Sequence, residues 1–488
     1  LWSRGLGDVY KRQSFMRALM KQSSWYFICN ALNNGLAIIL LPFLSRYLST
    51  EEYGIVQLST GIGLFLPMLF CGGIDKAIYR FYHEFNDKKK SELVSTIFWF
   101  VVTSGFIILS LFVLSSGLCF ERFLHIPAYP YSYLFAYPYL FLQIATIGLS
   151  VCQQTFNLKT MTIIEVVGTS INLFCSILFV LYVFDDGAFA RLLAISLSYV
   201  FKAAAYILLL LKFRLLKLRI SFRLIKSSVS YSLPLLPNSI ALWLIRTFDR
   251  VLVSYFCGPA ICGEYSVGVQ ISFVVYFIQD SVMQALGPLQ IQSFIDDKIA
   301  ALKRLFSLSH MLWLMMGFMT FLYCTVVPEL MNIFLDHKFV PNYLTVIFLT
   351  CVYIFQAQYR LFSDVLSFHK VTKWFMYAAV VQAAIGLLLN FILIPSIGYV
   401  AAGISNCVSV ITYTLIIIFA SKRYEEIDVN WKFYLSHLSF WVISFGVSYF
   451  FIDNILIKYS YLSIFIIIYL RSLYNEIKNR HIVIHLFK

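Results

Sequence analysis

The chain has 488 residues, of which 60% are hydrophobic and only 13% are charged, and its formal net charge is +14. Together with a mean hydropathy of +0.79, this composition excludes a soluble globular protein and predicts an all-α polytopic membrane protein. In a soluble chain the basic excess would favour nucleic-acid binding. Here most Lys and Arg fall in short loops between apolar runs, where they set topology, so no nucleic-acid partner is expected.

Residues 1–15 are expected not to belong to the folded protein. Within them, Asp8–Gln13 (DVYKRQ) is similar to a translated sequencing-adapter sequence. We therefore expect this stretch to be an artefact and exclude it from fold reasoning, with Met16 or Met20 as the expected start.

About 20 apolar residues are needed to cross a bilayer as a helix. That criterion predicts about fourteen transmembrane helices, at 25–44, 53–74, 93–118, 133–156, 161–184, 188–211, 229–256, 264–286, 305–327, 343–367, 374–394, 399–420, 434–452 and 455–473.

The loop charges predict the orientation of these spans. With the N-terminus in the cytoplasm, the outer side carries only Arg46, Arg122, Arg191 and Lys338, whereas all other Lys and Arg outside the spans after residue 15 lie on the inner side. This asymmetry follows the positive-inside rule. We expect a multi-pass protein of the bacterial cytoplasmic (inner) membrane with both termini inside.

A weak internal repeat predicts how the spans are grouped. The turn after the first span, Leu48–Gln57 (LSTEEYGIVQ), is similar to the turn after the seventh, Ile261–Gln270 (ICGEYSVGVQ). Both spans run in the same direction, which predicts parallel repeats around a central cavity. The expected division is an N-terminal six-helix bundle (16–211), a basic cytoplasmic linker (212–228), a C-terminal six-helix bundle (229–420), and two further helices with a cytoplasmic tail (421–488).

The seventh span holds the strongest candidate site. Arg246, Asp249 and Arg250 lie within five residues of each other in an apolar stretch that is broken early by Pro234 and Pro237. A charge in hydrocarbon is costly, so this group predicts a water-filled or substrate-filled cavity, with Arg246 about 15 Å from the outer end of its span. The structural alternative is a clamp in which Asp249 neutralises one of the arginines. A new helix is expected to start at Glu264, after the turn at Gly258-Pro259.

Three stretches resemble bacterial oligosaccharide flippases. They are Asn30–Gln57 with Gly73–Tyr82; the pattern SLPL…DR…G…GxYS between Ser232 and Ser266; and Asn390–Gly403 (NFILIPSIGYVAAG). The order and spacing are similar to those of the multidrug/oligosaccharidyl-lipid/polysaccharide exporter superfamily, with the Wzx O-antigen flippases as the nearest branch.

This resemblance implies a carrier, by expectation monomeric, that moves undecaprenyl-pyrophosphate-linked oligosaccharide units to the periplasmic leaflet by alternating access. It would serve O-antigen, capsule or exopolysaccharide synthesis. A proton or sodium gradient could drive it, without a cofactor. A polysaccharide polymerase and a chain-length regulator are possible partners, besides membrane lipid.

Other polar residues inside predicted spans are further candidates. A cavity-facing role is open for Lys202, where snorkelling to the interface is the alternative, and for three residues on one face of the first span, Asn30, Asn33 and Asn34. Two acids are candidates for ion coupling, namely Glu165, which shares a stripe with Thr169 and Asn172, and Asp280. Arg360 and Asp364 are spaced for an i, i+4 ion pair with a structural or gating role.

Two alternative functions remain open. A cation-coupled multidrug extruder shares the expected fold but usually has an acidic residue in the first span, and residues 25–44 contain none. A membrane polysaccharide polymerase or ligase would have similar hydropathy. The outer loops around 121–132 and 328–342 carry no paired carboxylates or His cluster, and the ten cysteines form no ligand pattern with His, so neither an enzyme nor a metal site is expected.

Overall fold

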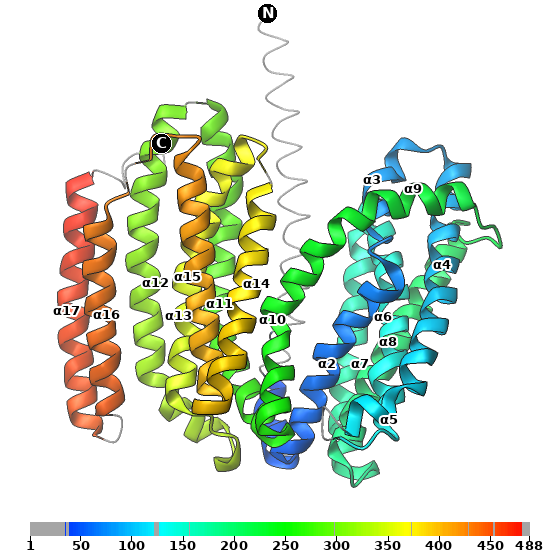
Figure 1. The fold of residues 1–488 in the computed structure, drawn as a ribbon, viewed down its shortest axis with the longest axis horizontal. Helices are drawn as coiled ribbons and strands as arrows, with labels where there is room; N and C mark the ends of the chain where they lie inside the picture. Colours follow the sequence, from blue (N-terminus) through cyan, green and yellow to red (C-terminus); the bar gives the residue numbers. More distant parts are fainter. Residues whose placement is uncertain are drawn as a thin grey trace, which may run out of the picture. The chain divides into compact units, whose positions relative to one another are not determined.

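The computed structural model describes residue 35 and residues 39–121, 126–155, 157–296, 298–371, 373–427, 429–451 and 454–480. Every regular element in this part of the chain is helical (Figure 1), which confirms the all-α class. The helices form two compact units, Leu1–Trp243 and Leu244–Lys488. The division into four segments made from the sequence stays a prediction.

The first unit is a bundle of long helices joined by short elements. Its elements are α2 (Thr50–Cys71), α3 (Lys76–Phe81), η1 (Tyr82–Glu84), α4 (Asp87–Leu114), α5 (Ser116–Cys119), α6 (Tyr131–Gln154), α7 (Leu158–Leu178), η3 (Phe179–Val183), α8 (Gly187–Lys212), α9 (Phe222–Ser232), η4 (Leu233–Leu235) and the first turns of α10 (Leu236–Cys257). Its core is formed by fully buried aliphatic side chains of α2, α4, α6 and α8, such as Leu66, Ile97, Ile147 and Leu210.

The start of α2 shows how local sequence places a helix end. Ser49 and Glu52 form a reciprocal capping box, in which the Glu52 N–H donates to Ser49 Oγ at 3.1 Å and the Ser49 N–H donates to Glu52 Oε2 at 2.6 Å. These bonds satisfy backbone donors that the helix leaves free. Glu52 Oε1 also accepts from the N–H of Gly187 at 2.7 Å, which joins the starts of α2 and α8.

The second unit contains the rest of α10 and seven further long helices. These are α11 (Pro259–Asp296), α12 (Lys298–Phe334), α13 (Tyr343–Phe368), α14 (Lys373–Ile397), α15 (Val400–Lys422), α16 (Trp431–Phe450) and α17 (Ile455–Arg480), with the short η5 (His337–Phe339). Helices α16 and α17 pack on α12 at one edge of this unit (Figure 1). There Gly317 leaves room for the buried ring of Trp441, since small residues let membrane helices approach closely.

The expected start of the helix after α10 is corrected. Gly258 ends α10 with a φ of +92°, and α11 begins directly at Pro259, so Glu264 lies inside the helix instead of at its start. Glycine adopts this left-handed backbone without strain, and proline suits the first position of a helix because no N–H is needed there.

Ten of the described helical stretches are long and apolar enough to cross a membrane: α2, α4, α6, α7 with η3, α8, and α11 to α15. Most of the predicted span 25–44 lies outside the described residues. The predicted spans at 229–256, 434–452 and 455–473 overlap α10, α16 and α17, which are not among the ten. The count of fourteen therefore stays a prediction.

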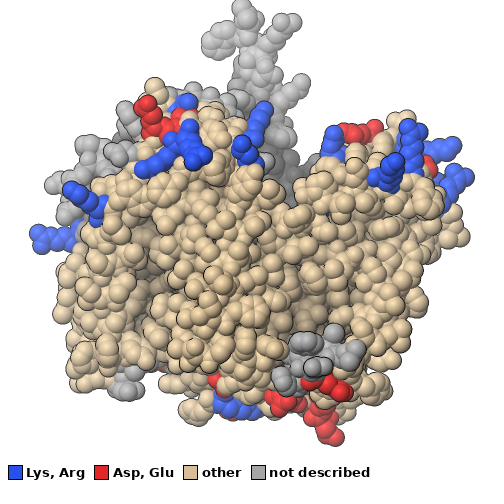
Figure 2. Space-filling model, viewed as in Figure 1, with Lys and Arg blue, Asp and Glu red and all other residues tan. Residues whose placement is uncertain are grey.

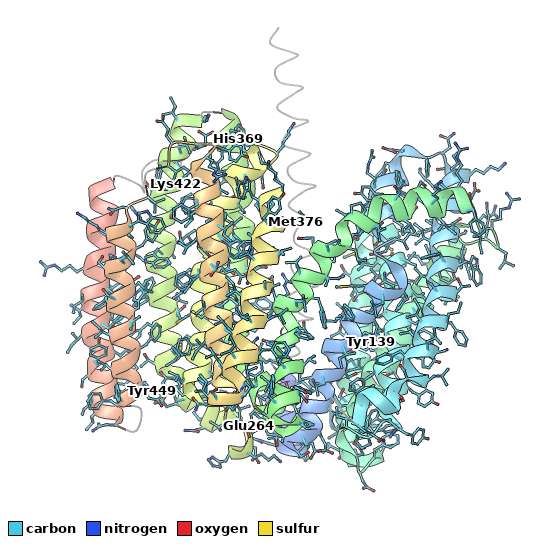
Figure 3. The ribbon with its side chains drawn as sticks, in the orientation of Figure 1. Tyr139, Glu264, His369, Met376, Lys422 and Tyr449 are labelled. Atoms are coloured by element: carbon cyan, nitrogen blue, oxygen red, sulfur yellow. The ribbon has the colours of Figure 1, made fainter. Side chains whose placement is uncertain are left out.

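On the face shown in Figure 2, charged side chains gather at the ends of each unit and leave a broad uncharged band between them. In the second unit, His369 and Lys422 lie at one end and Glu264 and Tyr449 at the other (Figure 3). This distribution matches helices that expose their middle to hydrocarbon and their ends to water.

Candidate functional site

Asp249 is the buried polar centre of the second unit. Its side chain is held by three donors: the Tyr265 hydroxyl, the Asn406 amide at 3.0 Å and the backbone N–H of Arg250 at 2.8 Å. Helices α10, α11 and α15 thus meet at one carboxylate that is only 6% exposed. These hydrogen bonds compensate the cost of burying it.

The two arginines beside Asp249 are not clamped by it. Among the described residues, no ion pair joins the Asp249 carboxylate to Arg246 or Arg250. Arg246 is exposed in the structure, and the buried Nε of Arg250 has no hydrogen-bond partner there. Both guanidinium groups therefore keep donors available for a ligand.

Two tyrosines extend the polar surface from these arginines along α11 and α13. The rings of Tyr276 and Tyr353 are in contact, with centroids 5.6 Å apart. Arg246 lies close enough to interact electrostatically with both hydroxyls, and Arg250 with that of Tyr353. Phenolic hydroxyls and guanidinium groups together offer hydrogen-bond donors to phosphate or sugar oxygens.

The expected i, i+4 ion pair between Arg360 and Asp364 does not form, although the two charges lie close enough to interact electrostatically. Arg360 of α13 instead forms an ion pair with Asp280 of α11, and Asp280 also accepts a hydrogen bond from Gln284 at 2.6 Å. The i, i+4 spacing permits the local pair, but α11 packs directly against α13 and presents a second carboxylate to the same guanidinium. Arg360 also acts electrostatically on Tyr276, so this pair borders the polar surface.

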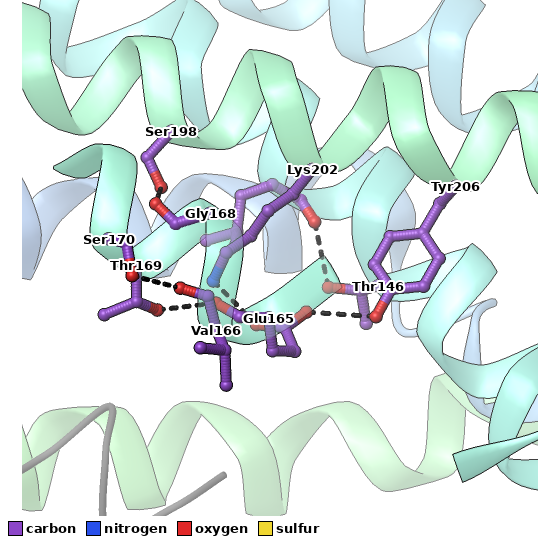
Figure 4. A network of polar contacts seen from close by, with 10 residues as sticks. Thr146, Glu165, Val166, Gly168, Thr169, Ser170, Ser198, Lys202 and Tyr206 are labelled. Atoms are coloured by element: carbon purple, nitrogen blue, oxygen red, sulfur yellow. Dashed lines mark hydrogen bonds and ion pairs between the residues drawn. The ribbon is translucent and has the colours of Figure 1, made fainter. Parts of the chain in front are cut away.

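A separate polar group lies inside the first unit (Figure 4). Lys202 of α8 donates to Glu165 of α7 at 2.6 Å, and the Tyr206 hydroxyl donates to the other carboxylate oxygen at 3.1 Å. The two charged side chains are only 12% and 15% exposed. Lys202 is therefore paired inside the bundle.

Gly168 makes this pair possible. A Cβ built at Gly168 would lie 2.5 Å from Lys202 Cε, so only glycine lets the lysine stem cross α7 to reach Glu165. The Ser198 hydroxyl also donates to the Gly168 carbonyl at 2.7 Å, which fixes α7 against α8.

Asn172 of the predicted stripe on α7 also contacts α8, whereas the Thr169 hydroxyl donates to the Glu165 carbonyl within α7. The guanidinium of Arg191 donates to Asn172 and to Ser176. Arg191, assigned to the outer side from the sequence, thus lies in the first turns of α8. The stripe that contains Glu165 and Asn172 is largely occupied by side chains of the same unit.

Some site residues lie elsewhere or were missed. Asn30, Asn33 and Asn34 fall outside the described residues. Asn406, Tyr276 and Tyr353 did not stand out in the sequence, and Tyr265 was noted only as part of the GxYS pattern. An amide within the apolar run of α15 was a usable signal for Asn406, but a chain with 32 tyrosines gave none for Tyr276 and Tyr353.

Comparison with known proteins identifies the family. Residues 19–294, more than half of the chain, match the family model described as polysaccharide biosynthesis protein. The chain belongs to this family. The resemblance to oligosaccharide flippases drawn from the sequence is thereby confirmed. A relative from Haemophilus influenzae, named only as an uncharacterized membrane protein, is 25% identical over 382 residues, covering 76% of this chain and 89% of its own length.

Solved structures show the same fold. The lipid II flippase MurJ in an inward closed conformation superposes with a TM-score of 0.67 at 15% identity, covering 93% of this chain and 99% of MurJ. An inward-facing multidrug resistance MATE family transporter of the MOP superfamily gives a TM-score of 0.56 at 13% identity, covering 82% of this chain and 96% of its own. The chain therefore has the fold of these two transport proteins, and its family is that of polysaccharide biosynthesis proteins.

Proposed function

We propose that this protein is a flippase for undecaprenyl-pyrophosphate-linked oligosaccharide repeat units. It moves them from the cytoplasmic to the periplasmic leaflet by alternating access, and it supplies O-antigen, capsule or exopolysaccharide synthesis. The protein lies in the bacterial inner membrane with both termini in the cytoplasm. This orientation puts the ends rich in Lys and Arg on the inner side.

The proposal depends on one observation, which is that Arg246 and Arg250 form no ion pair within the described part of the chain. Two guanidinium groups on one helix have no carboxylate partner among the described residues, although Asp249 is adjacent in sequence. An unpaired cation at membrane depth is costly unless water or a ligand solvates it. Because guanidinium donors match phosphate oxygens in geometry, a pyrophosphate group is the ligand that this arrangement fits best.

Other polar residues have supporting roles in this proposal. Tyr276 and Tyr353 offer hydroxyls beside the arginines for sugar or phosphate oxygens. The pair of Asp280 with Arg360 acts as a gate or as an ion-coupling site, and Asp364 and Glu165 are the other acids that a proton or sodium gradient can use. Lys202 is paired with Glu165 and has a structural role in this proposal. A substrate contact at Asn30, Asn33 or Asn34 of the first span stays a prediction.

A multidrug extruder shares this fold, so the distinction depends on charge. Cationic drugs require acidic contacts, whereas the polar surface of the second unit presents two arginines. A polymerase or ligase would need a catalytic cluster instead. We therefore propose a transporter that performs no covalent chemistry on its substrate.

The test is complementation of a strain that lacks its repeat-unit flippase and carries the matching glycan cluster. Arg246→Ala should lower surface glycan at least tenfold at equal protein level, because a charge-assisted phosphate contact is lost. Arg246→Lys should restore surface glycan only in part, since an ammonium cannot donate the two parallel hydrogen bonds that a guanidinium donates to a phosphate.

Arg304→Ala is the matched control, because it removes an exposed arginine from the first turns of α12. It should leave glycan export unchanged. Full activity of Arg246→Ala would remove the arginines from the substrate path and with them the proposal. Equal rescue by Lys would show that net charge alone is required there.

A further inference from the structure

A cavity of about 760 Å³ opens at the end of the first unit where α4 begins and α8 ends. Its wall includes four cations, Lys88, Lys90, Arg214 and Lys217, and one acid, Asp87. Figure 2 shows Lys and Arg gathered at this end of the unit. We call it the α4–α8 pocket.

The basic segment that follows α8 is fixed on α4 by a row of side chains one turn apart. Ser95 Oγ donates to the Leu215 carbonyl at 2.9 Å and accepts from the Lys217 N–H at 2.8 Å. Ser91 Oγ donates to the Arg214 carbonyl at 3.2 Å, and the Trp99 indole donates to the Lys217 carbonyl at 3.0 Å. A segment whose only role is to supply positive charge to a loop does not need such bonds.

Arg214 ends α8 in a Schellman motif, in which its N–H donates to the Leu211 carbonyl at 2.9 Å. Its φ is +56°, a left-handed conformation that non-glycine residues adopt at a cost. Leu215 next to it is buried, and its N–H donates to the Leu210 carbonyl at 2.9 Å. This helix end places Arg214 on the wall of the pocket.

The charges of the pocket are unbalanced. Lys90 forms an ion pair with Asp87 at 3.1 Å and lies over the ring of Tyr82 at 5.4 Å. For Lys88, Arg214 and Lys217 the described part of the chain provides no carboxylate partner. Three cations therefore face one open cavity with nothing of this unit to neutralise them.

We propose that the α4–α8 pocket binds a phosphate group, carried by an anionic lipid headgroup at the membrane surface or by a soluble phosphorylated compound. Basic pockets between membrane helices on the cytoplasmic side bind phosphate headgroups, and Arg offers two parallel donors to phosphate oxygens. The pocket lies wholly within the first unit, so it is distinct from the arginine site on α10.

The experiment uses the purified full-length chain in detergent and two probes. Tetraoleoyl cardiolipin binding is measured by native mass spectrometry, and ADP binding by isothermal titration. The test variant is Arg214→Asn/Lys217→Gln, because Asn tolerates the left-handed backbone and keeps the segment folded. The control is Arg223→Gln/Lys226→Gln, which removes the same charge from α9, outside the pocket.

A cation near an anionic surface contributes about fivefold in affinity, so the test variant should weaken binding of one probe about 25-fold and the control much less. Selective loss of cardiolipin supports the proposal with a lipid source, and selective loss of ADP supports it with a soluble source. Equal binding by the test variant and the control for both probes would overturn it. Because only binding is measured, the result is independent of the transport proposal.

Discussion

Lys202 of the first unit and Arg246 of the second are two cations of predicted spans in opposite states. Lys202 forms an ion pair with Glu165, which also accepts a hydrogen bond from Tyr206, and both charged side chains are at most 15% exposed. In the second unit, Arg246 is exposed, and Asp249 is bound to Tyr265 and Asn406 instead. A paired charge stabilises the packing of two helices, whereas an unpaired one keeps its donors for a ligand.

The strongest test of this contrast is Lys202→Ala. Removing one partner of a buried pair leaves Glu165 uncompensated, so the free energy of unfolding should fall by about 3 kcal/mol or more. The double variant Lys202→Met/Glu165→Gln should recover most of that loss. Both are compared by denaturant unfolding in mixed micelles. A single variant as stable as the double would mean that the pair contributes nothing to the bundle.

Gly168→Ala tests the same pair without removing a charge. The added methyl would displace the Lys202 stem, and overpacking of this kind should cost about 1–3 kcal/mol of unfolding free energy. Gly386→Ala is the control, because a Cβ there would meet Ser409 at an ordinary 3.7 Å. Equal stability of the two alanine variants would contradict the close packing at Gly168.

Arg246→Ala should behave differently from Lys202→Ala. With no partner to leave behind, its truncation should change the free energy of unfolding by less than about 1 kcal/mol, while export is lost as described above. The same unfolding assay measures it. A loss of stability as large as that of Lys202→Ala would show that the arginine is structural and would remove the contrast between these two residues.

The smallest effect is expected from Glu425, a paired acid in the loop after α15. Burial raises its pKa, but the ammonium of Lys298 at 2.8 Å and the His369 ring at 2.6 Å outweigh it and hold the pKa below its ordinary value. A lowered carboxyl pKa contributes stability that is present at neutral pH and is lost as pH falls through the folded-state pKa.

Thermal unfolding midpoints measured between pH 7 and pH 3 test this dependence of stability on pH. The wild type should lose stability below about pH 4.5, the ordinary value for Glu, and Glu425→Gln should be less stable at pH 7 and less dependent on pH. Identical pH profiles would mean that the cluster is not coupled to folding. His369→Gln separates the contribution of the imidazole from that of Lys298.

Local sequence predicted much of the fold because the decisive forces are local. A long apolar run forms a helix in a membrane whatever its neighbours are, since every backbone group must be satisfied within it. The start of α2 is also determined locally, by the capping box that Ser49 forms with Glu52. The start of α11 was missed because Pro259 was assigned to the turn.

For the site, the sequence predicted which polar residues take part but not how they are arranged. Sequence alone singled out Arg246, Asp249, Lys202, Glu165 and Arg360 as polar residues in apolar surroundings, because their cost in hydrocarbon does not depend on the fold. Their partners were not predictable. Arg360 had two carboxylates within reach, and the choice between them depends on how α11 packs against α13.

The sequence by itself determined that the chain is a helical membrane protein, which residues bring charge into it, and to which family it belongs. Only the tertiary structure decided which of those charges are neutralised. Pairing requires two side chains from different helices to meet within about 4 Å, and Glu165 with Lys202 or Asp249 with Asn406 meet only after the helices have packed. The same packing left Arg246 and Arg250 without a partner among the described residues, and it is their availability that supports a role in transport.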